Sequence, residues 1–324
     1  MYSIKYLQDK IKTEVEKLDF DLKPRLLYEP IAYTLSIGGK RLRPLLLLMS
    51  CDMFGGDLND SINPSIGVEI FHNFTLIHDD IMDNAPIRRN KPTVYKKWNA
   101  NIAILSGDVM FAKAYDYMLL TNPNALLNVI KTLNYVAIKV CEGQQYDMDY
   151  ETEDNISIDD YINMIRLKTG VLIAGSLKLG ALIAESSEKN AELIYQFGEK
   201  IGIAFQIQDD LLDAYSVNSK FGKSTGGDIV SNKKTFLLLK AFELADKNTL
   251  SELKDLMYKL KIDPEEKVQK VIAIYDKLDI KMTAIKEMKS YFDEGLRYLD
   301  MIDIKEDNKS NLRNFVNDLI NREY

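Results

Sequence analysis

Apolar residues recur at intervals of three or four along almost the whole chain, and no other feature limits the fold as strongly. Near the amino terminus, for example, Ile4, Leu7, Ile11, Val15 and Leu18 fall on one stripe of a helix. The alternation of apolar and polar residues that marks a half-buried strand is almost absent. The sequence therefore predicts an all-α protein, which we expect to be a single large helical bundle around a central cavity.

Turn residues predict where helices begin and end. Gly38-Gly39 is suited to end one helix, and Pro44 to lie in the first turn of the next. Three other prolines follow an Asn or Asp, a pairing that favours the start of a helix. These pairs are Asn63-Pro64, Asn122-Pro123 and Asp263-Pro264.

Five long helices are expected. Their predicted ranges are 64–82, 101–120, 124–150, 158–185 and 189–215. Two of them, 124–150 and 158–185, are apolar on several faces, which is typical of a buried central helix or of an interface between subunits. Only the loops near 84–93 and 217–230 interrupt the pattern, so we assign residues 1–324 to one domain.

Composition excludes several classes of protein. A chain of 324 residues that is 46% hydrophobic can bury a large core, and its net charge of −7 argues against nucleic acid as a partner. No apolar run reaches the roughly 18 residues of a membrane span, because Lys178 interrupts the best candidate. Residues 1–20 are charged rather than typical of a signal peptide, so we expect a cytoplasmic protein. Cys51 and Cys141 are isolated, and we interpret both as small core residues.

One acidic motif occurs twice with identical spacing. Asp79, Asp80 and Asp83 form a DDxxD motif at the end of one predicted helix, and a second copy at 209–213 ends another. Each copy crowds three carboxylates together, which is costly unless cations neutralise them. A single copy is often only a solvated helix end, but two copies facing each other would make a cage for metal ions.

The ligand type selects the metal and the class of substrate. Carboxylate oxygens without Cys or additional His favour several Mg²⁺ ions per site, for which Mn²⁺ can substitute, over zinc. Mg²⁺ is usually held by one or two carboxylates together with the phosphates of a substrate. The two motifs therefore indicate a phosphorylated substrate.

Cationic segments accompany the acidic motifs. Lys40, Arg41 and Arg43 lie in a turn that begins with two glycines, and Arg88-Arg89 follows the first motif. Glycines and lysines follow the second motif between 221 and 235. Such segments can bind phosphate, although each taken alone could be a solvated turn or a surface ion-pair patch.

Six segments in a fixed order resemble the trans-isoprenyl diphosphate synthase family, over residues 35 to 240. They are GGKRLRP at 38–44, FHNFTLIHDDIMD at 71–83, RRNKPT at 88–93, GQQYD at 143–147, KTG at 168–170, and FQIQDDLLD at 205–213 followed by FGKSTGGD. The family usually has Gly after the paired arginines, where this chain has Asn90, a residue that tolerates left-handed backbone angles. Some family members use a strongly basic carboxyl terminus to bind a diphosphate, and this chain has only Arg322 there. Together with the apolar central helices, the resemblance favours a homodimer.

The resemblance implies a Mg²⁺-dependent prenyltransferase. In this family an allylic diphosphate of C5 to C15 ionises to a carbocation, which the double bond of isopentenyl diphosphate attacks head to tail. Loss of a proton completes an all-trans product, and the departing diphosphate takes that proton. Mg²⁺ would stabilise the charge that develops on the leaving diphosphate.

The resemblance also assigns roles to residues of this chain. The metal ligands would be Asp79, Asp80, Asp83, Asp209, Asp210 and Asp213, of which Asp79, Asp83 and Asp209 are the most direct. The allylic diphosphate would be bound by Arg88, Lys168, Lys223 and Lys233. Isopentenyl diphosphate would be bound by Lys40, Arg43, His72 and Arg89. Thr169 and Gln206 would face the carbocation, with Gln144 and Asp147 as supporting residues.

Product length is expected to depend on the wall below the first motif. Phe74 and Phe71 precede Asp79 by five and eight residues, so both can point down the helix into the path of a growing chain. An aromatic ring there, beside the small Thr75, is typical of short-chain synthases that make C15 or C20 products. Both rings could instead be ordinary core residues, and a longer polyprenyl product would follow if they turn aside.

Two other functions use related chemistry. A class I terpene cyclase also uses metal ions to act on a diphosphate. Its second metal site is of a different type, and it needs no site for isopentenyl diphosphate. The second DDxxD motif and GGKRLR argue against it. A non-catalytic partner subunit is expected to lose metal ligands, whereas all six aspartates are present here.

Overall fold

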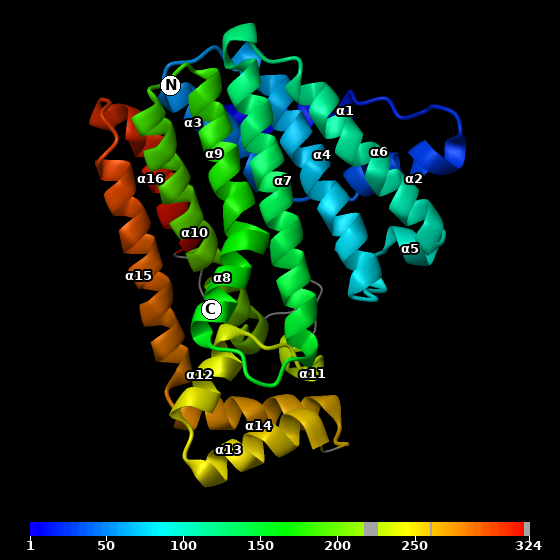
Figure 1. The fold of residues 1–324 in the computed structure, drawn as a ribbon, viewed down its shortest axis with the longest axis vertical. Helices are drawn as coiled ribbons and strands as arrows, with labels where there is room; N and C mark the ends of the chain where they lie inside the picture. Colours follow the sequence, from blue (N-terminus) through cyan, green and yellow to red (C-terminus); the bar gives the residue numbers. More distant parts are fainter. Residues whose placement is uncertain (217–225, 260, 321–324) are drawn as a thin grey trace. The chain divides into compact units, whose positions relative to one another are not determined.

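The computed structural model describes residues 1–216, 226–259 and 261–320 of the chain. Within these ranges the chain is helical almost throughout (Figure 1), and its strands are limited to β1 (Ile87–Arg88) and β2 (Lys91–Pro92). The prediction of an all-α fold is confirmed. The search of the described residues finds no helix that is long and apolar enough to cross a membrane.

The chain forms two compact units. Unit 1 comprises Met1–Ala137, Leu172–Gln196 and Leu299–Phe315, and unit 2 comprises Ile138–Val171, Phe197–Tyr298 and Val316–Tyr324. The first acidic motif lies in unit 1 and the second in unit 2. The assignment of a single domain, and the meeting of the two motifs, stay predictions.

Unit 1 contains the amino-terminal helices. They are α1 (Ile4–Glu16), α2 (Arg25–Ser36), α3 (Leu42–Met53), α4 (Leu58–Met82), α5 (Val94–Lys97) and α6 (Ala100–Met118). α4 packs along α6 over most of its length, and α3 packs against α4 (Figure 1). Leucines and isoleucines of α1 to α4 fill the core between these helices, with Leu7, Ile11, Leu47 and Ile70 fully buried.

Unit 2 contains most of the carboxyl-terminal helices. They are α8 (Ile158–Ile165), α11 (Gly227–Val230), α12 (Phe236–Leu244), α13 (Lys247–Lys254), α14 (Pro264–Lys277) and α15 (Ile280–Asp300), with π-helical turns at η1 (Arg166–Gly170) and η3 (Asp255–Lys259). Besides α15, whose last two residues belong to unit 1, four helices have residues in both units. These are α7 (Pro123–Thr152), α9 (Val171–Ile183), α10 (Glu188–Tyr215) and α16 (Glu306–Ile320).

Most predicted helix ends are confirmed. α7 begins at Pro123, and Asp263 caps α14 by accepting a hydrogen bond from the backbone N–H of Glu265 at 2.9 Å. Gly38 and Gly39 follow α2 with φ angles of 81° and 151°, which residues with a side chain rarely adopt. Pro44 lies in the first turn of α3, as expected.

The predicted helix start at Asn63-Pro64 is wrong. α4 begins at Leu58 behind the cap Asp57, so Pro64 lies inside the helix. Proline has no N–H, which leaves the carbonyl of Asp60 without its usual helical donor. The hydroxyl of Thr121 donates to that carbonyl at 3.4 Å and partly replaces the missing hydrogen bond.

Apart from the start of α4, the long helices agree with the predicted ranges, with one interruption. The predicted helix 158–185 is divided by η1 into α8 and α9. α9 is almost completely buried, whereas α7 exposes Leu127, so the two apolar helices differ in environment. Cys51 is buried as expected, but Cys141 is exposed, because it lies on the outer face of α7 rather than in the core.

Candidate active site

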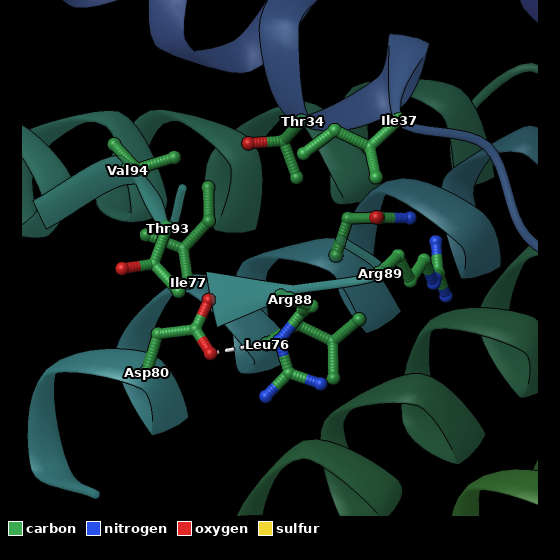
Figure 2. Close-up of a pocket in the computed structure, with 10 residues that line it drawn as sticks. Thr34, Ile37, Leu76, Ile77, Asp80, Arg88, Arg89, Thr93 and Val94 are labelled. Carbon is green, nitrogen blue, oxygen red and sulfur yellow. Dashed lines mark hydrogen bonds and ion pairs between the residues drawn. The ribbon is translucent and has the colours of Figure 1, made fainter. Parts of the chain in front are cut away.

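The first acidic motif lies at the carboxyl end of α4, and its three carboxylates differ in environment. Asp79 is partly exposed and Asp83, the last residue before the loop, is exposed. Asp80 is only 3% exposed and accepts a hydrogen bond from Nε of Arg88 at 2.7 Å. Burial raises the pKa of Asp80 to about 6, although Arg88 opposes this shift. Figure 2 shows Arg88 turned toward Asp80 while Arg89 extends away from it.

A tight hairpin presents the paired arginines. β1 and β2 are antiparallel, and Arg89 and Asn90 at the turn have φ angles of 52° and 60°. Two successive positive φ angles are typical of a type I′ hairpin turn, which Asn accommodates. Asn90 therefore adopts the left-handed backbone angle that the sequence analysis expected this residue to tolerate.

Arg89 connects the hairpin to the glycine turn. Its Nη1 donates a hydrogen bond to the carbonyl oxygen of Gly38. A Cβ atom at Gly39 would lie 2.6 Å from the same guanidinium, so only glycine allows this close approach. The segments GGKRLRP and RRNKPT thus meet, with Lys40 exposed on the turn.

Arg41, Arg43 and Arg89 form a basic cluster beside the first motif, and His72 lies against it. Nη1 of Arg43 lies 3.2 Å from Nε2 of His72, the α4 residue two turns before Asp79. Burial, together with Arg43 and Arg89, holds the pKa of His72 well below its usual range. The imidazole is therefore neutral, and its Nε2 can accept the hydrogen bond from Arg43.

Glu69 is the counter-charge of this basic cluster and was missed by the sequence analysis. It is 5% exposed, and its Oε1 accepts a hydrogen bond from Asn73 at 3.1 Å. Burial raises the pKa of Glu69, and the nearby guanidinium groups of Arg41, Arg43 and Arg89 oppose this shift. Three guanidinium groups around one carboxylate leave a net positive site suited to an anion. A charged residue within the apolar run of α4 was the signal that could have revealed it.

A wall of aromatic rings lies below the first motif. The ring centroids of Phe71 and Phe74 are 5.5 Å apart, and Phe111 of α6 lies 6.1 Å from the first and 5.3 Å from the second. Phe71 is completely buried, whereas Phe74 keeps some exposure. Phe111 was missed because only the contact between α4 and α6 brings it to this wall.

The second motif repeats the arrangement of the first. On α10, Asp209 is exposed and Asp213 is partly exposed, whereas Asp210 is 4% exposed. Asp210 accepts hydrogen bonds from the hydroxyl of Tyr161 at 2.5 Å and from the backbone N–H of Phe236 at 3.3 Å. Burial raises the pKa of Asp210 to about 7. The sequence analysis missed Tyr161, which comes from a helix 49 residues earlier.

The donor set suits a hard divalent cation. The first and third aspartates of each motif lie one helical turn apart and keep access to solvent, while the protein itself engages the middle one. In the ranges the structure describes, no three His, Cys, Asp or Glu side chains form a ready-made metal site. Mg²⁺ commonly takes one or two carboxylates and completes its shell with water and substrate phosphate, so these oxygens fit it. Direct ligation by Asp80 and Asp210 stays a prediction.

The π-helical turn η1 carries two predicted site residues, Lys168 and Thr169. Such turns add a residue to a helix and are frequent at functional sites. Nζ of Lys168 lies 2.6 Å from Oδ2 of Asp147, and Nζ of Lys233 lies 4.0 Å from the same oxygen. Burial raises the pKa of Asp147, but Lys233 and Lys168 more than offset it and hold the pKa below its ordinary value.

Gln206 links the π-helical turn to the second motif. Its Oε1 accepts a hydrogen bond from Thr169 at 3.1 Å, and its Nε2 donates to Asp210 at 3.3 Å. Gln144 is buried, and neither polar atom of its side chain has a hydrogen-bond partner in the described part of the chain. Lys223 and Arg322 lie outside the described residues.

Comparisons with known proteins identify the family. A model of the polyprenyl synthetase family matches residues 24–276. The chain belongs to the polyprenyl synthetase family. This polyprenyl synthetase is 35% identical to the geranylgeranyl diphosphate synthase of Methanosarcina mazei over 329 residues, which covers 98% of each protein. It is 37% identical to the geranylfarnesyl diphosphate synthase of Natronomonas pharaonis over 68% of this chain and 70% of that protein.

A solved structure supports the same conclusion. The crystal structure of the geranylgeranyl pyrophosphate synthetase from Pyrococcus horikoshii matches with a TM-score of 0.91 and 33% identity, over 99% of this chain and 97% of that one. This polyprenyl synthetase is therefore an enzyme, a prenyltransferase. Family members act on isoprenyl diphosphates with the help of a divalent metal.

Proposed function

We propose that this prenyltransferase condenses isopentenyl diphosphate with an allylic diphosphate of C5 to C15. The reaction is head to tail and gives an all-trans product of C15 or C20. The observation that carries the proposal is the basic cluster of Arg41, Arg43 and Arg89 beside the first acidic motif, with His72 next to Arg43. A terpene cyclase needs no second anion site of this kind, whereas a condensing enzyme must hold two diphosphates at once.

The acidic motifs would hold Mg²⁺, or Mn²⁺ in its place. Asp79 and Asp83 from α4, and Asp209 and Asp213 from α10, offer carboxylates with access to solvent. The bound metal would neutralise charge on the leaving diphosphate. Asp80 keeps Arg88 in place for the same diphosphate, since their side chains are hydrogen-bonded.

The allylic diphosphate would be bound by Arg88, Lys168 and Lys233, joined by Lys223. Asp147 lies near both Lys168 and Lys233, so it can hold the two ammonium groups close to one another before the anion arrives. The hydroxyl of Thr169 and the side chain of Gln206 would face the carbocation with oxygen lone pairs. The departing diphosphate would take the final proton.

The aromatic wall supports a short product. Phe74 and Phe111 are the partly exposed rings of the wall, whereas Phe71 is buried, so the growing chain would meet Phe74 or Phe111 before Phe71. The relatives are named as synthases of C20 and C25 diphosphates, which favours C20 for this chain. A longer polyprenyl product is the alternative if Phe74 turns away.

We also propose a cytoplasmic homodimer in which each chain is one catalytic domain. In unit 1, α6 exposes Leu105 at 58% and α7 exposes Leu127 at 64%, and Ile104 and Tyr135 are also exposed. The two helices contact each other through the hydroxyl of Tyr115 and the side chain of Asn134. A second copy of the chain would cover this apolar surface, and sedimentation would report its mass.

Product analysis tests the proposal. The protein is incubated with Mg²⁺, isopentenyl diphosphate and a C5, C10 or C15 allylic diphosphate, and the products are separated by chromatography. We expect a C15 or C20 diphosphate whose formation requires isopentenyl diphosphate. Products formed without isopentenyl diphosphate would favour a cyclase, and no turnover of any substrate would favour a partner subunit.

Variants test the metal role separately. Asp79→Ala and Asp209→Ala should each lower turnover by about 100-fold or more, because each removes charge compensation at the leaving group. Asp9→Ala removes an exposed carboxylate of α1 that is paired with Lys5, and should leave turnover unchanged. Wild-type turnover in both motif variants would defeat the metal role.

A further inference from the structure

The segment that carries Lys233 is tied to the second acidic motif at both of its ends. The backbone N–H of Gly226 donates to the carbonyl of Asp213 at 2.7 Å, and that of Asp228 donates to its carboxylate at 2.9 Å. At the far end, the N–H of Phe236 donates to Asp210 at 3.3 Å. These bonds fix where the segment begins and ends.

Lys234, near the far end of the same segment, binds it to the carboxyl end of α7. Its Nζ donates hydrogen bonds to the backbone carbonyls of Tyr150, at 2.7 Å, and of Glu153. The last carbonyls of a helix have no helical partner and lie at the negative end of the helix dipole. An ammonium group there satisfies the carbonyls and is electrostatically favourable.

The position of this anchor matters because of what lies one turn earlier on α7. Oδ2 of Asp147 accepts a hydrogen bond from Nζ of Lys168 at 2.6 Å. Nζ of Lys233 lies 4.0 Å from the same oxygen. Lys233 and Lys234 are adjacent, so the bond from Lys234 to the end of α7 limits where Lys233 can lie. The ammonium group of Lys234 itself points at backbone carbonyls, so we do not expect it to bind the substrate directly.

We propose that Lys234 is a positioning residue for the allylic diphosphate, which holds Lys233 beside Asp147 and Lys168 by fastening its segment to the end of α7. This inference rests on the proposed function, in which Lys168 and Lys233 bind that diphosphate. It adds a residue whose effect on the substrate passes through Lys233. Loss of the anchor lets Lys233 move away from the site without removing its charge.

A double-mutant cycle separates this role from a general effect of charge. The four proteins are wild type, Lys234→Met, Lys233→Ala and the double variant. Calorimetry gives the Kd of geranyl diphosphate with Mg²⁺, and kinetics gives the KM values of both substrates. Lys234→Met should weaken binding of geranyl diphosphate about tenfold and leave the KM of isopentenyl diphosphate unchanged. In the Lys233→Ala background the same substitution should have no further effect.

Matched variants complete the test. Lys234→Arg can still donate to the carbonyls and should recover most of the affinity, whereas Lys240→Met removes a lysine that is paired with Glu243 on α12 and should change nothing. If Lys234→Met does not fold, Lys234→Gln replaces it in the cycle. An undiminished affinity in the single variant, or an equal loss with and without Lys233, would overturn the inference. A wild-type protein that binds geranyl diphosphate but makes no product would count against the proposed function alone.

Discussion

Replacing Gly143 by alanine should push apart two helical segments of the candidate site. Gly143 lies in α7 opposite the π-helical turn η1, where a Cβ atom would lie 2.3 Å from the backbone nitrogen of Lys168 and 2.7 Å from its Cα. Ordinary contacts start at 3.4 Å, so the two backbones must separate by about 1 Å. Backbone atoms cannot rotate away as the end of a side chain can.

The size of the effect follows from two opposing contributions. Overpacking of this kind costs about 1–3 kcal/mol, and alanine in place of glycine within a helix returns about 1 kcal/mol. We therefore expect the free energy of unfolding to fall by up to about 2 kcal/mol. The loss of activity should be larger, because a shift of about 1 Å in a binding group can lower kcat/KM by about 100-fold. Lys168 would move relative to Asp147, to which it is now bonded at 2.6 Å.

Urea unfolding and the kcat/KM for the allylic diphosphate measure the two quantities. Gly295→Ala is the matched control, since Gly295 is also helical and its added atom would meet only side chains, with Ile201 Cδ1 nearest at 3.1 Å. That side chain can shift, so the control should keep its activity and stability. If Gly143→Ala behaves like the control in both assays, the close approach of α7 to η1 does not position Lys168.

Three further predictions concern other parts of the chain. Tyr161→Phe should lower the free energy of unfolding by about 1–3 kcal/mol in urea titrations, because it removes the 2.5 Å hydrogen bond to buried Asp210; an unchanged midpoint would contradict this. Phe74→Ala should lengthen the product by one or more isoprene units on chromatography, and an unaltered product would place the growing chain elsewhere. At pH 8 a maleimide should modify exposed Cys141 and spare buried Cys51 in the folded protein, because burial raises the pKa of Cys51 to about 11 and leaves almost no thiolate. Mass spectrometry of peptides identifies the modified cysteine, and modification of Cys51 would contradict this.

Features encoded by neighbouring residues could be predicted from the sequence. The starts of α7 and α14 depend on a capping side chain and a proline next to each other, at Pro123 and Pro264, and both predictions are confirmed. The start of α4 was predicted wrongly, because Asn63-Pro64 carries the same signal inside that helix, after its cap at Asp57. Pro64 lies inside that helix, and Thr121, which is far away in the sequence, donates to the carbonyl that the proline leaves without a donor.

The same distinction applies to the candidate site. The spacing of each acidic motif placed its carboxylates at a helix end, but the sequence could not show that the middle aspartate differs from its neighbours. Burial of Asp80 and Asp210 depends on partners outside the motif, Arg88 in one case and Tyr161 in the other. Arg88 is close in the sequence and was among the predicted residues, whereas Tyr161 carries no signal of its own.

The π-helical turn η1 also determines where single residues can be deleted from this helical segment of the enzyme. η1 holds one residue more than an α-helical turn of the same height, so deleting any residue from Arg166–Gly170 would let a regular helix form. The side chains of α9 would keep their directions, because the wider turn absorbs the extra residue, whereas a residue deleted from α9 itself would rotate every later side chain by about 100° about the helix axis. Because α9 is buried on nearly all sides, such a rotation would misplace its whole packing surface. Surface loops can gain or lose residues, whereas within this long helical segment a change of one residue is absorbed only at the π-helical turn.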